Sequence, residues 1–352
     1  MKIRRTCFLF TFFLLMFSSK AQQYYFEHFQ VENGLSNNTA TCVIQDSKGF
    51  IWIGTKDGLD RFDGYNFKIF RNRQDDSTSL GNNSVWKLYE GSNGIIWVGT
   101  EHGLYQLDAG SEKFSFLAGT PKAQIRSIAE DNNGTIWFIV GLQLYQYQPA
   151  TKKIRAFTGD KLQHCSTLTI SANNQLWVAN MYGEIGNYDP QTETFTYYSV
   201  FSHSGIPVSR WIERIFETGQ GYFLIGTSNQ GIKKFNINDR CYEDLLIYNQ
   251  DKTAIFARDF ARSKDNEFWV ASESGIYIYN TQENRFTNLK KDYSNPYAIS
   301  DNAVYSFFRD REGGIWAGTY FGGVNYYPAE NPAFEKYFPG GSATSLLGNA
   351  VR

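Results

Sequence analysis

Three stretches of the sequence share one pattern and decide the fold: VIQDSKGFIWIGTKDGLDRFD (43–63), VWKLYEGSNGIIWVGTEHGLYQLD (85–108) and VYSFFRDREGGIWAGTYFGGVNYY (304–327). Each stretch is centred on a tryptophan, and three weaker copies are too, whereas a seventh copy (YFLIGT) has a leucine there. These centres are Trp52, Trp97, Trp137, Trp177, Leu224, Trp269 and Trp316. By subtraction, successive centres lie 40 to 47 residues apart, a period typical of propeller blades with four strands. The sequence therefore predicts an all-β chain whose residues 22–340 form a seven-bladed β-propeller of four-stranded antiparallel blades.

Two turn positions fix the register of every copy independently of the tryptophans. Three residues before each centre stands a glycine or an asparagine: Gly49, Gly94, Gly134, Asn174, Gly221, Asn266 and Gly313. These two residue types accept a positive φ at low cost, so we expect a left-handed residue that closes a hairpin. Six residues before each centre stand Asp46, Gly91, Asp131, Ser171, Thr218, Ser263 and Asp310. Except for the glycine, these short polar side chains can bind the N–H groups of the turn, which favours a turn over a calcium loop at Asp131 and Asp310.

The strands themselves predict close packing between blades and closure of the ring. The run Ile51-Trp52-Ile53 does not alternate with polar residues, so we expect a strand that is covered on both faces. A small residue stands two positions after six of the seven centres, and Ile139 is the exception. An aromatic outer strand follows each copy, and an eighth such strand, Phe26 to Phe29, precedes the first. The hypothesis is that this early strand completes the last blade, and the alternative is that Phe334 to Tyr337 does so.

Charge and the N-terminal residues set the class of protein. The net charge of −1 favours neither nucleic acid nor any other strongly charged partner. Residues 1–21 combine early basic residues with an apolar run and end in Ser19-Lys20-Ala21, which predicts a secretory signal peptide. After its removal three cysteines remain, Cys42, Cys165 and Cys241. Their odd number excludes a disulfide scaffold, allows at most one bridge, and favours three mostly buried apolar residues.

The pattern D-x-x-G-x-[IL]-W-[IV]-G-T-x-x-G-L resembles the two-component regulator propeller repeat, found in the sensors of hybrid two-component systems of Bacteroidetes. The resemblance implies the N-terminal periplasmic part of a hybrid sensor histidine kinase that forms a homodimer. Such proteins carry two propellers, a β-sandwich, a helix in the inner membrane and a kinase. Residues 344–351 repeat residues 78–85, so 341–352 are expected to begin a further blade of a truncated second propeller. No kinase motif stands in this chain, which is therefore not expected to be an enzyme or to contact the membrane itself.

The four histidines, His28, His102, His164 and His203, lack metal-ligand spacing, so neither a metal nor a cofactor is expected. Ligand contacts are expected on the face formed by the turns between second and third strands and the connections between blades. The candidates there are Lys56, Asp57, Glu101, His102, Asn180, Tyr182, Arg210, Asn229, Glu273, Tyr320 and Phe321. Their aromatic, amide and charged groups suit an oligosaccharide or another periplasmic ligand. The alternative is a secreted propeller enzyme, a glycosidase or lyase, that acts on polysaccharide.

The third copy departs from the repeat, because Trp137-Phe138-Ile139-Val140-Gly141-Leu142 lacks the GTxxG turn. The face of the propeller must differ at this blade. A pocket wall, a protein contact and sequence drift all remain open.

Overall fold

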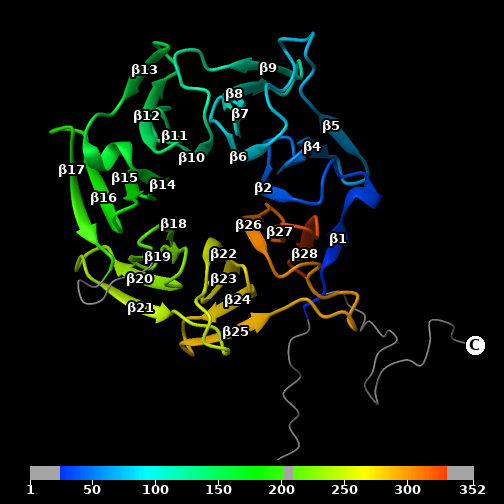
Figure 1. Ribbon diagram of the computed structural model, residues 1–352, viewed down its shortest axis with the longest axis vertical. Coiled ribbons are helices and arrows are strands. Elements are labelled where there is room, and N and C mark those ends of the chain that lie inside the picture. The colour runs from blue at the N-terminus through cyan, green and yellow to red at the C-terminus, as the bar shows by residue number, and fades with distance from the viewer. Residues whose placement is uncertain (1–23, 202–208, 331–352) are drawn as a thin grey trace, which may run out of the picture.

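The computed structural model describes residues 24–201 and 209–330. They form seven four-stranded antiparallel sheets arranged as blades around a central axis, as Figure 1 shows. The predicted seven-bladed propeller is confirmed. The expected signal peptide, the strand from Phe334 to Tyr337 and the start of a further blade at 341–352 lie outside the described residues.

Each blade contributes one inner strand beside the axis and one second strand next to it. The inner strands are β2 (Ala40–Gln45), β6 (Val85–Glu90), β10 (Ile125–Glu130), β14 (Cys165–Ile170), β18 (Ile212–Glu217), β22 (Ala257–Lys264) and β26 (Val304–Arg309). The second strands are β3 (Ile51–Thr55), β7 (Ile96–Thr100), β11 (Ile136–Val140), β15 (Leu176–Asn180), β19 (Tyr222–Thr227), β23 (Glu267–Ser272) and β27 (Ile315–Thr319).

The third and outer strands complete the blades. The third strands are β4 (Gly58–Phe62), β8 (Gly103–Asp108), β12 (Gln143–Gln148), β16 (Glu184–Asp189), β20 (Ile232–Asn236), β24 (Gly275–Asn280) and β28 (Val324–Tyr327). The outer strands of blades 1 to 6 are β5 (Phe67–Phe70), β9 (Lys113–Phe116), β13 (Lys153–Ala156), β17 (Thr194–Ser199), β21 (Tyr242–Leu246) and β25 (Arg285–Leu289). Two short 3-10 helices, η1 (Val31–Asn33) and η2 (Asp160–Gln163), stand in the connections.

The outer strand of blade 7 comes from the other end of the chain. Strand β1 (Glu27–Phe29) pairs antiparallel with β28, and Figure 1 shows the blue N-terminal strand beside the red C-terminal one. Phe26 is buried against Trp269 and Tyr327, and Phe29 stacks on Trp316 of blade 7 while also contacting Phe62 of blade 1. The predicted closure by the early strand is confirmed, so the edge of β28 is covered by a strand from the other end of the chain.

Apart from the half-buried Glu267 of β23, the second strands are buried throughout, because each lies between two neighbouring blades. The small residues after the central tryptophans make room for the start of the next inner strand. A Cβ added at Gly54 would lie 2.7 Å from a methyl of Val85, and one at Gly99 would lie 2.7 Å from Ile125 Cβ. In blade 3 the larger Ile139 packs in a cluster with the small Cys165 of the next inner strand. The larger side chain on the second strand of blade 3 is therefore matched by a smaller one on the inner strand of blade 4.

The hairpin turns confirm the sequence prediction at six of its seven positions. Gly49, Gly94, Gly134, Asn174, Gly221 and Gly313 all have positive φ. The expectation for Asn266 is wrong, because its φ is not positive. There β22 extends to Lys264 and β23 starts at Glu267, so a two-residue turn replaces the longer one.

Candidate functional site

A β-bulge interrupts the start of every inner strand. In each blade the register between the first and second strands skips the second residue of the inner strand. We call these seven skipped residues the bulge residues: Thr41, Trp86, Arg126, Ser166, Glu213, Arg258 and Tyr305. A bulge bends the strand locally and re-aims a side chain. The seven blades therefore present a ring of variable side chains around one end of the axis.

Each bulge residue lies beside the turn between the second and third strands of its own blade. The first residue of that turn follows the bulge residue by fifteen positions in all seven blades, and we call these the turn residues: Lys56, Glu101, Gly141, Met181, Ser228, Glu273 and Tyr320. In six blades the turn residue donates its N–H to the residue just before the inner strand, as Glu101 does to Ser84 at 2.9 Å. The turns and the connections thus share one face, as predicted. We call the two sets together the mouth ring.

Blades 1 and 2 place a lysine, an indole and a carboxylate in contact. The ammonium of Lys56 lies 3.9 Å from the ring centroid of Trp86, and Trp86 Nε1 donates to Glu101 Oε2 at 2.5 Å. Two of the predicted ligand residues are therefore brought together. The indole between them was missed by the sequence analysis, although its distance of fifteen residues from Glu101 was a usable signal.

A second group of side chains spans blades 6 and 7. Arg258 binds Glu273 through Nε at 2.7 Å and lies 4.1 Å from the ring centroid of Tyr305. Tyr305 meets Tyr320 edge to face at 5.3 Å, and Tyr320 meets Phe321 at 4.3 Å. Phe321 is 72% exposed. Three predicted residues, Glu273, Tyr320 and Phe321, thus belong to one continuous row of aromatic and charged groups.

A side chain of blade 3 contacts the connection into blade 5. The guanidinium of Arg126 lies 5.1 Å from the ring centroid of Trp211, and its Nε donates to the carbonyl of Gly141 at 2.6 Å. Glu213 lies nearby, and burial raises the pKa of its carboxyl although Arg258, Lys87 and Arg126 oppose this.

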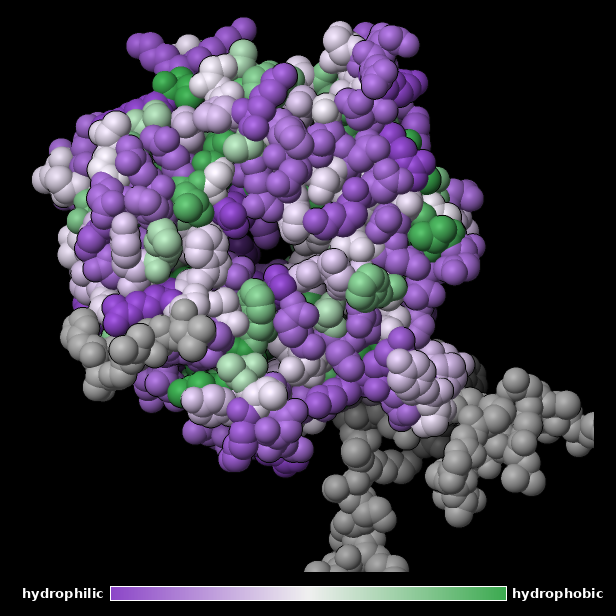
Figure 2. Space-filling view, in the orientation of Figure 1, coloured by the Kyte–Doolittle hydropathy of each residue, from purple (hydrophilic) through white to green (hydrophobic). Residues whose placement is uncertain are grey.

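Behind the mouth ring lies a cavity of about 360 Å³ at the centre of the propeller. All seven inner strands line it, and Lys87, Arg214 and Asp259 are its charged residues next to the bulges. Arg214 and Asp259 form an ion pair with Nε and Oδ1 3.0 Å apart. Figure 2 shows the central hollow with hydrophilic residues around it. The mouth ring is therefore the rim of a polar channel.

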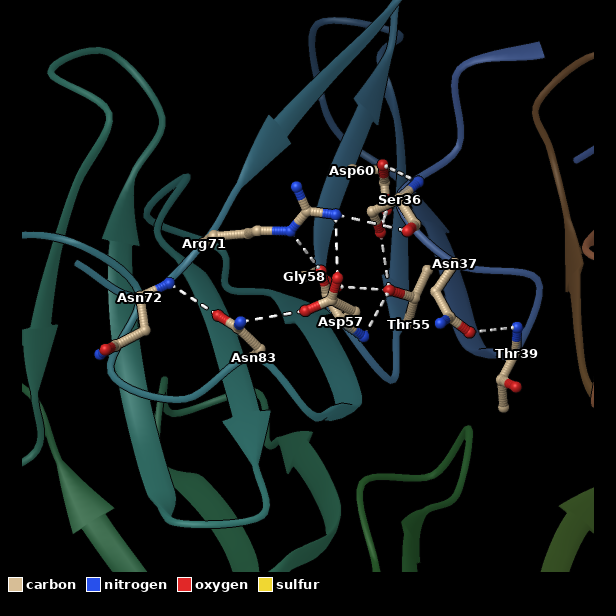
Figure 3. A network of polar contacts seen from close by, with 10 residues as sticks. All are labelled: Ser36, Asn37, Thr39, Thr55, Asp57, Gly58, Asp60, Arg71, Asn72 and Asn83. Atoms are coloured by element: carbon tan, nitrogen blue, oxygen red, sulfur yellow. Dashed lines mark hydrogen bonds and ion pairs between the residues drawn. The ribbon is translucent and has the colours of Figure 1, made fainter. Parts of the chain in front are cut away.

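Asp57 belongs to a network between blade 1 and the connection to blade 2 (Figure 3). Its carboxylate accepts from Asn83 Nδ2 at 3.0 Å and pairs with Arg71 at 2.9 Å, while Asn83 Oδ1 accepts from the N–H of Asn72. The carbonyl of Asn83 also accepts from the N–H of Gly58 at 2.8 Å. These contacts hold the connection to the blade, so Asp57 has a structural role.

The remaining candidates lie apart from these groups. Asn180 is fully buried, and its amide binds Glu184 and the N–H of Tyr182, so it cannot meet a ligand at the surface. The hydroxyl of Tyr182 donates to Asp160 at 3.2 Å. The predicted residue His102 lies 3.0 Å from the amide of Asn82.

The last two candidates flank the connection into blade 5. The amide of Asn229 lies within hydrogen-bond distance of the backbone of Ser209, at 2.9 and 3.0 Å. The half-buried Arg210 packs beside Gly183.

Two other kinds of feature are absent from residues 24–201 and 209–330. No group of three or more His, Cys, Asp or Glu side chains within these ranges could hold a metal ion. In the same ranges, none of the helices has the length and apolar character needed to cross a membrane. Cys42, Cys165 and Cys241 are all free, and Cys241 is exposed, so the expectation that all three are buried is wrong for that residue.

The chain matches the family model described as two component regulator propeller at residues 34–57, 79–102 and 298–321. Over 72 residues it is 40% identical to "Histidine kinase P4" of Formosa agariphila, which is 20% of this chain and 5% of that protein. It also resembles the extracellular domain of a putative hybrid two-component system from B. thetaiotaomicron, with a TM-score of 0.78 and 25% identity over 92% of this chain.

That match covers 44% of the B. thetaiotaomicron structure, so the chain spans less than half the length of these relatives. Virginiamycin B lyase from Staphylococcus aureus shares the fold alone, with a TM-score of 0.68 and 14% identity over 87% of this chain and 99% of the lyase. The repeat, the seven blades and these similarities agree: three segments of the chain match the two component regulator propeller model, and its fold is similar to the extracellular domain of a putative hybrid two-component system.

Proposed function

We propose that this propeller is the ligand-sensing part of a hybrid two-component sensor and that it binds an oligosaccharide at the mouth ring. The row of Arg258, Tyr305, Tyr320 and Phe321 carries the proposal, because it offers an exposed aromatic face beside charged hydrogen-bonding groups. Sugar rings have apolar faces that stack on aromatic side chains and hydroxyls that bond to polar ones. The rigid blades hold these groups in place before a ligand arrives.

The similarity to extracellular domains supports a location outside the cytoplasm, with export by the segment 1–21. We propose that the whole protein is anchored in the inner membrane, forms a homodimer and passes the binding signal to a histidine kinase. Anchoring and dimerisation are what the resemblance of the repeat implies, and the name of the F. agariphila relative supports the kinase.

The alternative of a polysaccharide-cleaving enzyme has weaker support. A glycosidase needs two carboxyl groups free to act on one bond. Of the carboxylates in the described mouth ring, Glu101 is bonded to Trp86 and Glu273 to Arg258, while Glu213 is buried among three cations. These contacts commit the carboxylates to holding the ring together.

Isothermal titration with a panel of oligosaccharides tests the proposal. Phe321→Ser should lower affinity roughly two- to tenfold, because one stacked aromatic contact is lost. Tyr65→Ser is the matched control, since Tyr65 is 91% exposed in the turn between β4 and β5, at the opposite face. An equal loss in both variants, or no binding of any sugar by the unchanged protein, would contradict the proposal.

A further inference from the structure

Arg126 is a bulge residue whose turn residue has no side chain. Gly141 has a φ of +62°, and a Cβ built on it would meet no atom within 4 Å. The first turn position of blade 3 therefore opens onto free space beside Arg126. This is the blade in which the sequence departs from the GTxxG turn.

The guanidinium of Arg126 is nevertheless held in one place. Its Nε donates to the Gly141 carbonyl at 2.6 Å, and its Cζ lies 5.1 Å from the ring centroid of Trp211. Among the contacts of the described residues, neither of its two terminal Nη groups has a hydrogen-bond or ion-pair partner. A partly buried arginine that is held in place, and whose two Nη groups are free to donate, can bind a planar anion such as a carboxylate in a bidentate manner.

Blade 6 shows what fills the equivalent place. There the bulge residue is Arg258 and the turn residue is Glu273, whose carboxylate accepts from both Nε and Nη2 of the arginine. The separation of fifteen residues is the same as that between Arg126 and Gly141. Blade 6 thus supplies a carboxylate from its own turn, whereas the turn of blade 3 offers Arg126 only the carbonyl of Gly141 and no side chain.

The surrounding charges permit an anion at this place. Burial lowers the pKa of Arg126, while the carboxylates of Glu213 and Glu101 oppose this. Neither of these carboxylates forms an ion pair with Arg126 within the described residues. Glu213 faces Lys87 and Arg258 as well as Arg126, so three cations share its single charge. Among the described residues, Arg126 thus has carboxylates nearby but none in direct contact with its guanidinium.

We infer that the mouth ring selects oligosaccharides that carry a carboxylate, and that Arg126 binds this group in the space left by Gly141. The inference rests on the proposed function and narrows its ligand class to sugars containing uronic acids. Arg126 would act as the specificity-determining residue, and the aromatic row of blades 6 and 7 would contribute to affinity for any sugar.

The test compares acidic and neutral forms of the same sugars by isothermal titration. Tetrasaccharides of galacturonate, glucuronate, mannuronate and guluronate are each paired with the carboxyl-reduced form. The unchanged protein should bind at least one acidic tetramer about tenfold more tightly than its reduced partner, because a charge-assisted bidentate bond is formed. Arg126→Gln should abolish this preference, measured as the ratio of the affinities for the acidic and the reduced form.

A second pair of variants tests the space itself. Gly141→Glu would place a carboxylate where blade 6 has Glu273, and it should remove the acidic preference. Gly141→Asn is the control, because asparagine tolerates positive φ and adds no charge, and it should keep at least half of the preference. Thermal unfolding of both variants checks that the fold is retained.

The outcomes separate the inference from the function on which it rests. Equal affinity for acidic and reduced forms, or an acidic preference that survives Arg126→Gln, would overturn the inference while oligosaccharide binding stood. Failure of the unchanged protein to bind any of the eight sugars or the wider panel would overturn both.

Discussion

The carboxylate of Asp46 accepts a hydrogen bond from Nε1 of Trp52, with 2.8 Å between Oδ2 and the indole nitrogen. Its other oxygen, Oδ1, accepts the N–H groups of Lys48 and Phe50 at 2.9 and 3.0 Å. One buried side chain therefore ties the hairpin turn to the tryptophan at the centre of the blade. Asp131 and Asp310 make the same bond to Trp137 and Trp316, at 2.9 Å each. These bonds show that the aspartates in these turns stabilise the turns themselves.

Replacing Asp46 with alanine should lower the free energy of unfolding by roughly 3 kcal/mol, because three donors lose a charged acceptor in a buried site. Asp46→Asn should also destabilise, since its amide would direct a donor at either Trp52 or the turn. Urea unfolding followed by tryptophan fluorescence measures both changes. Asp75→Ala serves as the control, because Asp75 is exposed. A loss at Asp46 no larger than that at Asp75 would contradict this account.

Ser171→Asp should stabilise blade 4 by about 1 kcal/mol, the typical value of one satisfied buried hydrogen bond. Ser171 stands where blades 1, 3 and 7 have Asp46, Asp131 and Asp310, and Nε1 of Trp177 is buried without a hydrogen-bond partner among the described residues. The new aspartate would lie near Glu217, which accepts a hydrogen bond from the N–H of Ala172. Blade 1 has the same arrangement, because Glu90 accepts from the N–H of Ser47 beside Asp46. A glutamate at this distance is therefore compatible with an aspartate in the turn. Thermal and urea unfolding of the variant measure the effect, and destabilisation would show that the turn of blade 4 cannot adopt the geometry of blade 1.

Asp60→Asn should stabilise the protein at pH 7 by roughly 2 kcal/mol. Asp60 is fully buried, and burial raises the pKa of its carboxyl from 3.8 to about 6 against the hydrogen bonds from Ser36 (Figure 3). The folded state therefore binds more protons than the unfolded state between pH 4 and 6, so this group's contribution to stability falls as pH rises through that window.

Blade 7 supplies the precedent for this variant, since Asn325 there accepts from Ser300 N and donates to Ser300 Oγ, both at 2.8 Å. The stability difference between Asp60→Asn and the unchanged protein should shrink towards pH 4. Unfolding in urea at pH 4, 5, 6 and 7 measures it, and a difference that does not vary with pH would rule out Asp60 as the titrating group.

Phe26→Ala should destabilise the closed ring by roughly 3–5 kcal/mol, the usual cost of removing a buried phenylalanine. Phe26 is 2% exposed and lies between blades 6 and 7, against Trp269 and Tyr327. Its N–H also donates to the carbonyl of Tyr297 at 2.9 Å. Deletion of residues 24–29 should lower the melting temperature further, because β28 would lose its only outer neighbour among the described strands. Val31→Ala, at a residue 50% exposed, is the control, and an unchanged melting temperature after deletion would exclude closure by this strand.

The sequence by itself determined the number of blades and the register of their hairpins. Both depend on interactions between residues that are close in the sequence. A glycine or asparagine such as Gly49 permits the left-handed turn, and an acceptor such as Asp46 binds N–H groups within a few residues. It also pointed to the early strand that closes the ring. The expectation of a left-handed turn residue was wrong only at Asn266. There the strands β22 and β23 are longer, and their pairing outweighed the preference of asparagine for that turn.

Only the tertiary structure decided which side chains form the mouth ring. The bulge residues leave no mark on the hydrophobic pattern, because inner strands lie beside neighbouring blades on both faces, and so Arg126, Arg258 and Tyr305 were not singled out. Conversely, Asn180 was expected at the surface and is buried by its own turn. The contact between Arg126 and Trp211 joins residues 85 positions apart by subtraction, two blades away from each other. Such meetings depend on the curvature of the closed ring, which no short stretch of sequence encodes.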